Sequence, residues 1–203
     1  MKIVGILGSP RKGGNTETLL DLALDEAHEK GVRTEKIALR DKAIAPCDGC
    51  QRCIQTGTCV IEDDAQEIYH AMLESDGIIW ATPIYFWSMS GQTKTLMDRT
   101  YALTFPKLQL VNKVGGLILV AGRRGCMNTA NVFHQYFTYN HMFFAEFAWG
   151  YASDRGEIKK KDLATNMAIE MVHQMISLIN ANLKYPEEFD APIPRLARKK
   201  YRL

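Results

Sequence analysis

The sequence predicts an α/β protein with a five-stranded parallel sheet and helices on both faces. Short apolar segments of strand type alternate along the chain with segments in which apolar residues recur every three or four positions. The chain has 203 residues, which is enough for one well-cored domain and too few for two. Apolar residues make up 46% and charged residues 24%, both ordinary values for a globular protein.

The first half of the chain follows a strand–helix–strand order. Lys2–Leu7 is an apolar run typical of a buried strand, and Thr16–Lys30 carries its apolar residues on one helical face. Arg33–Leu39 alternates apolar and polar residues, as a second strand would. A cysteine-rich stretch then interrupts the pattern, and Asp63 or Asp64 is placed to cap the next helix.

The second half supplies three more strands. Gly77–Ala81, Val114–Ala121 and Met142–Trp149 are apolar and of strand length. The loop TPIYFWSMSG follows the first of them, and a helix is expected from about Gln92. The last helix is the clearest, because apolar residues between positions 164 and 179 keep a strict spacing of three and four.

We expect one domain with two additions. A single α/β domain covers residues 1–184, with a cysteine-rich insertion at 45–60, and a basic tail covers residues 185–203. The net charge of +2 is too small to favour nucleic acid as a partner. The N-terminal residues show no signal-peptide pattern, and no segment has the roughly 18 consecutive apolar residues of a membrane helix. The expected location is therefore the cytoplasm, without membrane attachment.

The loop GSPRKGGNT, residues 8–16, stands between the first strand and the first helix. It lacks the lysine and hydroxyl residue of a Walker A loop, and it lacks the glycine spacing of a dinucleotide fingerprint. What remains is a helix N-terminus with backbone N–H groups, the neutral donors Ser9, Asn15 and Thr16, and the cation Arg11. This set suits one terminal phosphate. The alternative is a plain turn in which Asn15 caps the helix.

Two further loops are expected at the same edge of the sheet. In a parallel sheet the ligand lies outside the carboxyl ends of the strands, where the strand order reverses. The loop at 82–91 places aromatic residues there, which either pack on a partner subunit or cover a flat ring system. The third loop is AGRRGC, residues 121–126.

The motifs SPRKGGNT and TPIYFWSMSGQTKTLMDR together resemble the NADPH-dependent FMN reductase family, a branch of the flavodoxin-like folds. The resemblance implies a flavodoxin-like three-layer sandwich that binds FMN. In that family the first loop holds the FMN phosphate and the second lies along the isoalloxazine ring. The residues implied as cofactor contacts are Ser9, Arg11, Asn15 and Thr16 for the phosphate, Pro83, Ile84, Tyr85, Phe86, Trp87, Ser88 and Met89 for the ring, and Gly122 and Arg123 for its pyrimidine side.

Four of the five cysteines, Cys47, Cys50, Cys53 and Cys59, fall within thirteen residues, and Cys126 stands alone as an expected buried thiol. Four thiolates match the ligand count of a [4Fe–4S] cluster. Tetrahedral zinc also takes four thiolates, although structural zinc sites more often split them into two distant pairs, and free or oxidised thiols are a third interpretation. The spacing also resembles the iron–sulfur flavoproteins, a subgroup of the same family, which implies a [4Fe–4S] cluster on the four residues.

Together these features predict an FMN-dependent oxidoreductase that passes electrons between FMN and the cluster, with NAD(P)H or a ferredoxin-like protein as donor. The flavin supplies the reactive atom, so no catalytic side chain is expected. The alternatives are a cluster-free NAD(P)H-dependent flavin or quinone reductase, a non-enzymatic electron carrier and a zinc-stapled binding module. The aromatic segments 85–87 and 133–144 predict a homodimer or homotetramer, because a monomer rarely exposes so much apolar surface.

Overall fold

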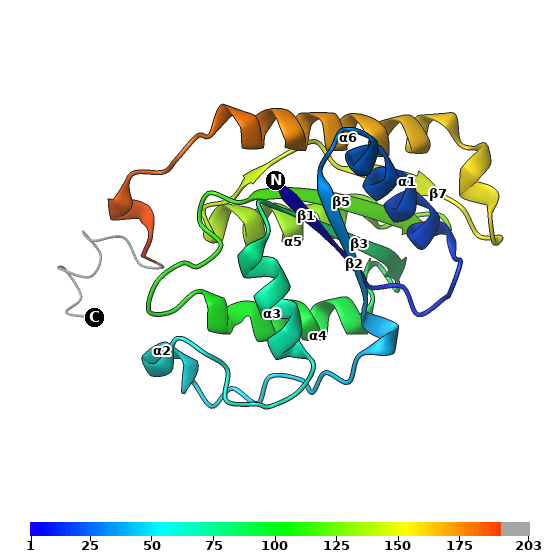
Figure 1. Ribbon diagram of the computed structural model, residues 1–203. Helices are drawn as coiled ribbons and strands as arrows, with labels where there is room; N and C mark the ends of the chain where they lie inside the picture. Colours follow the sequence, from blue (N-terminus) through cyan, green and yellow to red (C-terminus); the bar gives the residue numbers. More distant parts are fainter. Residues whose placement is uncertain (192–203) are drawn as a thin grey trace.

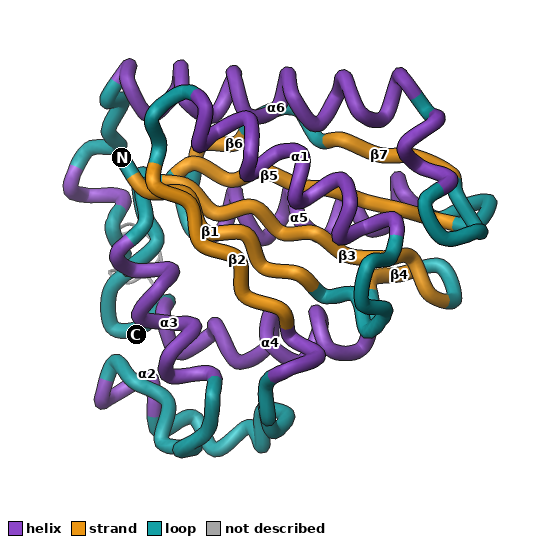
Figure 2. The backbone as a smooth tube through the Cα atoms, turned by 45° about the vertical axis from the view of Figure 1, so that its right-hand side comes forward, coloured by secondary structure: helices purple, strands orange, loops and turns teal. Residues whose placement is uncertain are grey.

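A twisted parallel sheet lies between two layers of helices (Figure 1, Figure 2). The computed structural model describes residues 1–191. The strand order is β2-β1-β3-β5-β6, and β7 also pairs with β5. This is the strand order of the flavodoxin-like fold, in which the order reverses between β1 and β3. The predicted fold class is therefore confirmed.

The central strands of the sheet are almost fully buried. Strands with helices on both faces bury both sides, which is why these segments read as continuous apolar runs. Their bounds are Lys2–Leu7 (β1), Arg33–Ala38 (β2), Gly77–Tyr85 (β3), Ser88–Met89 (β4), Val114–Ala121 (β5), Phe143–Phe144 (β6) and Ala148–Tyr151 (β7).

Each face of the sheet has its own hydrophobic core. Helices α1 and α6 cover one face, where Leu20 and Met175 pack with Ile79. Helices α3, α4 and α5 cover the other face, where Phe133 packs on Trp80. Cys126 is buried in this second core, as expected. The helices are Asn15–Glu29 (α1), Cys53–Thr56 (α2), Ala65–Glu74 (α3), Gly91–Arg99 (α4), Cys126–Tyr139 (α5) and Asp162–Ala181 (α6).

The sheet has seven strands rather than the five expected, partly because the predicted fifth strand is broken. Strand β6 pairs Phe144 with Gly115, and β7 pairs Ala148 with Ile118. These two pairs are four residues apart along the β6–β7 segment but only three apart along β5. The β6–β7 segment therefore contains one extra residue. This is a β-bulge, and it splits Met142–Trp149 into two strands.

The other additional strand belongs to a short hairpin. Strand β3 runs four residues beyond the predicted end at Ala81, and β4 pairs with it in antiparallel register. Phe86 and Trp87 form the turn, with φ values of 43° and 74°. Two successive residues with positive φ fit the two-residue turns that match the twist of a hairpin. The segment expected as a loop is therefore a short hairpin that extends the sheet.

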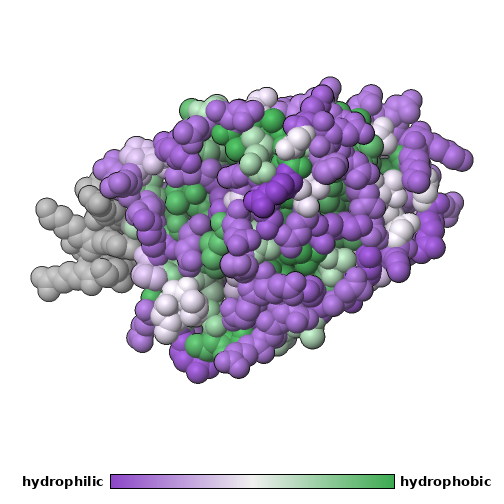
Figure 3. Space-filling view, viewed as in Figure 1, coloured by the Kyte–Doolittle hydropathy of each residue, from purple (hydrophilic) through white to green (hydrophobic). Residues whose placement is uncertain are grey.

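The surface in Figure 3 is mainly hydrophilic, with apolar side chains showing between charged ones. The first residues of the expected tail pack on the domain, since the Tyr185 ring stacks on His141 and Phe143. The Tyr185 N–H also donates to the Asn112 side chain at 2.7 Å. The basic sequence RLARKKYRL, residues 195–203, lies outside the described residues.

Candidate functional site

Four connections meet at the carboxyl edge of the sheet (Figure 1). They are residues 8–14 after β1, the turn 86–87 after β3, residues 122–125 after β5 and residues 152–156 after β7. The strand order reverses between β1 and β3 at this edge. A parallel sheet leaves a crevice for a ligand at such a point.

Two adjoining pockets at this edge bring most of the predicted cofactor residues together. The first pocket is lined by Ser9, Arg11, Asn15, Thr16, Pro83, Ile84, Tyr85 and Gly122, together with Gly14, Val120, Ala152 and Ser153. The second pocket shares Ile84 and Gly122 with the first and adds Phe86, Trp87, Arg123 and Arg124. Three loops that are far apart in the sequence thus line one continuous region.

Ser88 and Met89 line neither of these two pockets. Both lie on β4, the returning strand of the hairpin. Ser88 is exposed, whereas Met89 is 5% exposed and belongs to the core beneath the sheet. Side chains alternate between the two faces of a strand, which is why Ser88 is exposed while its neighbour Met89 is buried.

Glu17 holds the first loop in shape from the first turn of α1. Its carboxylate accepts the Gly13 N–H at 2.7 Å and the Arg40 guanidinium at 3.0 and 3.1 Å. The Lys36 ammonium lies 3.1 Å away. Burial raises the pKa of this carboxyl, but hydrogen bonds from Arg40, Gly13 and Lys36 outweigh burial and lower the pKa to about 2. Gly13 therefore gives its N–H to Glu17 rather than to a ligand.

Asn15 begins α1, but its side chain bonds to the loop after β7. Its Nδ2 donates to the Asp154 carbonyl at 2.8 Å, and its Oδ1 accepts the Ile158 N–H at 3.4 Å. Gly14 takes the N-cap position, and no side chain caps the helix there. The N–H groups of residues 15–17 have no partner within the helix, as in any first turn. These free N–H groups lie where the sequence predicts an anion site.

A buried hydroxyl network fixes the first loop against the hairpin. Ser90 caps α4, and its hydroxyl donates to the Gly8 carbonyl at 2.7 Å. The Thr93 hydroxyl lies 2.9 Å from the Ser90 Oγ and donates to the Thr82 hydroxyl at 3.0 Å. A Cβ at Gly8 would lie 1.8 Å from the Thr93 hydroxyl oxygen, so only glycine fits at this position.

The loop after β7 is missing from the sequence-based site. Ala152 and Ser153 line the same pocket as the first loop. Arg155 donates to the Lys12 carbonyl at 2.6 Å, which joins the two loops. The expected fifth strand ends at Trp149, whereas β7 continues two residues further. The sequence would have indicated this loop only if the fifth strand had been predicted to end at Tyr151.

The cysteine segment, residues 45–60, runs past α3 and α4 on the side away from the sheet (Figure 1). Cys47 and Cys50 are exposed, Cys53 and Cys59 are half-buried, and all four are free thiols. The four line one cavity. Burial raises the pKa of the Cys53 thiol, and the nearby Cys59 raises it further. Among residues 1–191, none that lines this cavity lines either pocket at the carboxyl edge.

The chemistry of this cavity fits a thiolate-bound metal centre. Its four thiols equal the ligand count of a [4Fe–4S] cluster or of tetrahedral zinc. Gly49 and Gly57 have φ values of 69° and 73°, which lets the segment turn tightly between the cysteines. Within residues 1–191, no three histidine, cysteine or acidic side chains stand close enough to hold a metal ion as placed. The thiols would therefore have to come closer together to bind one.

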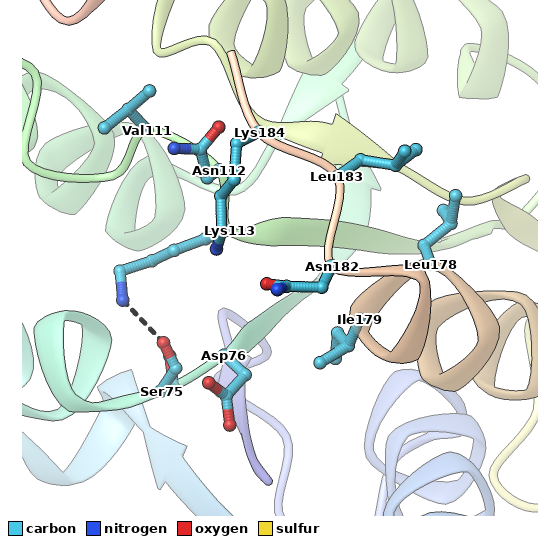
Figure 4. Close-up of a pocket in the computed structure, with 10 residues that line it drawn as sticks. All are labelled: Ser75, Asp76, Val111, Asn112, Lys113, Leu178, Ile179, Asn182, Leu183 and Lys184. Carbon is cyan, nitrogen blue, oxygen red and sulfur yellow. Dashed lines mark hydrogen bonds between the residues drawn. The ribbon is translucent and has the colours of Figure 1, made fainter. Parts of the chain in front are cut away.

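A separate pocket lies at the opposite edge of the sheet (Figure 4). Lys113 crosses it and donates to the carbonyl oxygens of Leu73 at 2.8 Å and Ser75 at 2.5 Å. Burial lowers the pKa of Lys113. The Asp76 carboxylate accepts the Lys2 N–H at 2.8 Å. Because these charged groups already form hydrogen bonds with backbone groups of the chain, we assign no ligand to this pocket.

Residues 1–154, which include the first three loops and all the cysteines, match the NADPH-dependent FMN reductase family. The chain belongs to this family. An iron–sulfur flavoprotein of Methanocaldococcus jannaschii is 45% identical to this family member over 144 residues, which are 70% of this chain and 74% of that protein. An iron–sulfur flavoprotein of Methanosarcina thermophila is 44% identical over 61% of this chain and 65% of its own length. The protein is an FMN-dependent oxidoreductase of the iron–sulfur flavoprotein subgroup.

A crystal structure of RosB with bound 8-demethyl-8-formylriboflavin-5'-phosphate is similar to this FMN reductase family member, with a TM-score of 0.76. It covers 100% of this chain and 86% of RosB at 16% sequence identity, so the likeness concerns the fold alone.

Across the described residues, no helix combines the length and the apolar character needed to cross a membrane.

Proposed function

We propose that this oxidoreductase passes electrons between FMN and a [4Fe–4S] cluster held by Cys47, Cys50, Cys53 and Cys59. The observation that carries the proposal is the single cavity lined by these four thiols. The names of the similar iron–sulfur flavoproteins support it. FMN takes up a hydride as two electrons and can release them singly, while a cluster carries one. The donor is NAD(P)H or a ferredoxin-like protein, and the acceptor is a small molecule or a redox protein.

In this proposal the pockets at the carboxyl edge hold FMN. The N–H groups of residues 15–17 and the Arg11 guanidinium bind the phosphate, with Ser9 and Thr16 as neutral donors. Asn15 contributes its backbone N–H, since its side chain is engaged by the loop after β7. These groups orient the cofactor through hydrogen bonds and charge, without forming a covalent bond to it.

The ring end of the cofactor lies between the hairpin and the third loop. Tyr85, Phe86 and Trp87 supply flat apolar surfaces that exclude water from one side of the ring. Gly122 allows close approach on the other side, and Arg123 adds positive charge near the pyrimidine edge. Positive charge there stabilises the negative charge of a reduced flavin.

The cluster is tested by changing each cysteine of the segment to alanine in turn. Anaerobic wild-type protein should hold about four irons and absorb broadly near about 400 nm beyond the flavin bands. Each single variant should lose the iron and this band but keep FMN, because the two cavities share no lining residue within residues 1–191. Cys126→Ala is the matched control and should keep both groups.

The contrary result is equally definite. If reconstituted, oxygen-protected protein holds no iron and the four variants match the wild type in electron transfer, the cluster is absent. The cluster-free NAD(P)H-dependent flavin or quinone reductase then replaces the proposal.

The phosphate site is tested by Arg11→Ala. Loss of one charge-assisted hydrogen bond should weaken FMN binding by about 1–3 kcal/mol in a fluorescence titration. Riboflavin, which lacks the phosphate, should bind the variant and the wild type equally. Lys12→Ala is the control, because within residues 1–191 the hydrogen bond of Lys12 to another loop is made by its carbonyl and not by its side chain. An equal loss for both ligands would place Arg11 away from the phosphate.

A further inference from the structure

Arg99, the last residue of α4, is a charged residue whose side chain is 0% exposed. Its guanidinium donates to both oxygens of Asp63, at 2.6 and 3.0 Å. It also donates to the Ala45 carbonyl at 2.8 Å and to the Ile61 carbonyl at 3.2 Å. A buried charge is tolerated only when it is paired and hydrogen-bonded, and Arg99 meets both conditions.

The partners of Arg99 lie at the two ends of the cysteine segment. Ala45 is its first residue, and Ile61 directly follows its last. Asp63 strengthens the junction, because its carboxylate also accepts the Ala45 N–H at 2.9 Å. Burial raises the pKa of the Asp63 carboxyl, but the hydrogen bond from Arg99 and two backbone N–H groups outweigh burial and lower it. One ion pair therefore closes a loop that contains all four thiols.

The rest of the cysteine segment is tied to the domain less firmly. The Gln66 amide donates to the Cys59 and Ile61 carbonyls at 3.0 Å, and Gln109 donates to the Gly57 carbonyl at 3.1 Å. These are neutral hydrogen bonds at the partly exposed surface, and each contributes less than a charge-assisted pair. Arg99 also lines the cavity of the four cysteines.

We propose that Arg99 is the positioning residue of the cysteine segment: with Asp63 it clamps both ends of the segment so that the four thiols share one cavity. The clamp is a property of the chain with or without a bound group. Its effect on cluster retention rests on the proposed function.

The test uses Arg99→Lys and Asp63→Asn in the full chain with FMN bound. Lysine keeps the charge but cannot form the planar fork that reaches Asp63 and two carbonyls together. Asparagine removes the negative charge at nearly constant size. Two rates are measured in cluster-free protein: alkylation of each cysteine, followed by mass spectrometry, and tryptic cleavage after Arg52.

We expect both variants to raise the cleavage rate after Arg52 and the alkylation rates of Cys53 and Cys59 about tenfold, through local opening of the segment. Alkylation of the buried Cys126 should not change, which separates local opening from general loss of stability. Lys94→Met is the matched control on the same helix, because it breaks only the exposed pair with Asp98. In reconstituted protein, the two clamp variants should also lose the cluster absorption faster than this control.

Folded variants with wild-type rates at Arg52, Cys53 and Cys59 would overturn the clamp. An equal rise at Cys126 would also overturn it, since Arg99 would then support the whole fold. If no form of the protein holds iron, the proposed function fails, but the two rates still decide the role of Arg99.

Discussion

The pocket at the carboxyl edge and the cysteine segment are both sites on one small domain, but they are built differently. The pocket is formed where strands end, and its loops are joined by the buried bonds among Gly8, Thr82, Ser90 and Thr93. The cysteine segment has only the one-turn helix α2, and two of its thiols are exposed. A site at the edge of a sheet takes its shape from the fold, whereas an inserted segment depends on a few anchoring bonds.

The largest expected effect comes from filling the space at Gly8. Gly8→Ala should destabilise the protein by about 3 kcal/mol in urea denaturation, because the new methyl group would collide with the Thr93 hydroxyl. FMN binding should weaken with it, while alkylation of the cysteine segment under native conditions stays unchanged. Gly91→Ala is the control, since a Cβ there would meet no atom within 4 Å. A fully stable Gly8→Ala variant would contradict the tight packing of the first loop.

A smaller effect is expected from Glu17, which holds the first loop but touches no part of the cysteine segment. Its pKa falls from 4.5 to about 2 on folding, so its stabilising effect is complete well above pH 4.5 and is lost as the pH falls towards 2. Between pH 6 and pH 3 the wild type should lose about 2 kcal/mol that Glu17→Gln does not lose. Urea denaturation across this range measures the difference. Glu67→Gln, at an exposed salt bridge, should follow the wild type.

The smallest effect on stability is expected at the tip of the hairpin. Phe86 is 97% exposed and Trp87 is 52% exposed. We expect these side chains to be covered in a homodimer or homotetramer. Phe86→Ser should lower the mass measured by light scattering and change the unfolding free energy of the monomer by less than about 0.5 kcal/mol. A wild-type protein that is already a monomer with FMN bound would rule out this assembly.

Most of the sheet and one side of the site could be predicted from the sequence. Apolar runs such as 114–121 mark strands buried on both faces, and the first loop stands out by composition. The bulge near Ala145 could not be predicted, because one extra residue leaves the apolar pattern almost unchanged. The role of Met89 could not be predicted either, since it depends on a turn that reverses the strand direction. Arg99 looks like any helix-end cation until Asp63 is placed beside it.

Helix α4 has a role that neither site shows alone. Its N-cap Ser90 bonds to the first loop, and its last residue Arg99 bonds to both ends of the cysteine segment. Arg99 lies nine residues after Ser90, so the helix between these anchors is a stiff spacer of about 13 Å. One inserted residue would turn Arg99 by about 100° around the helix axis and away from Asp63. The length of α4 is therefore constrained by two sites at once, whereas within residues 1–191 the cysteine cavity and the pocket at the carboxyl edge share no lining residue.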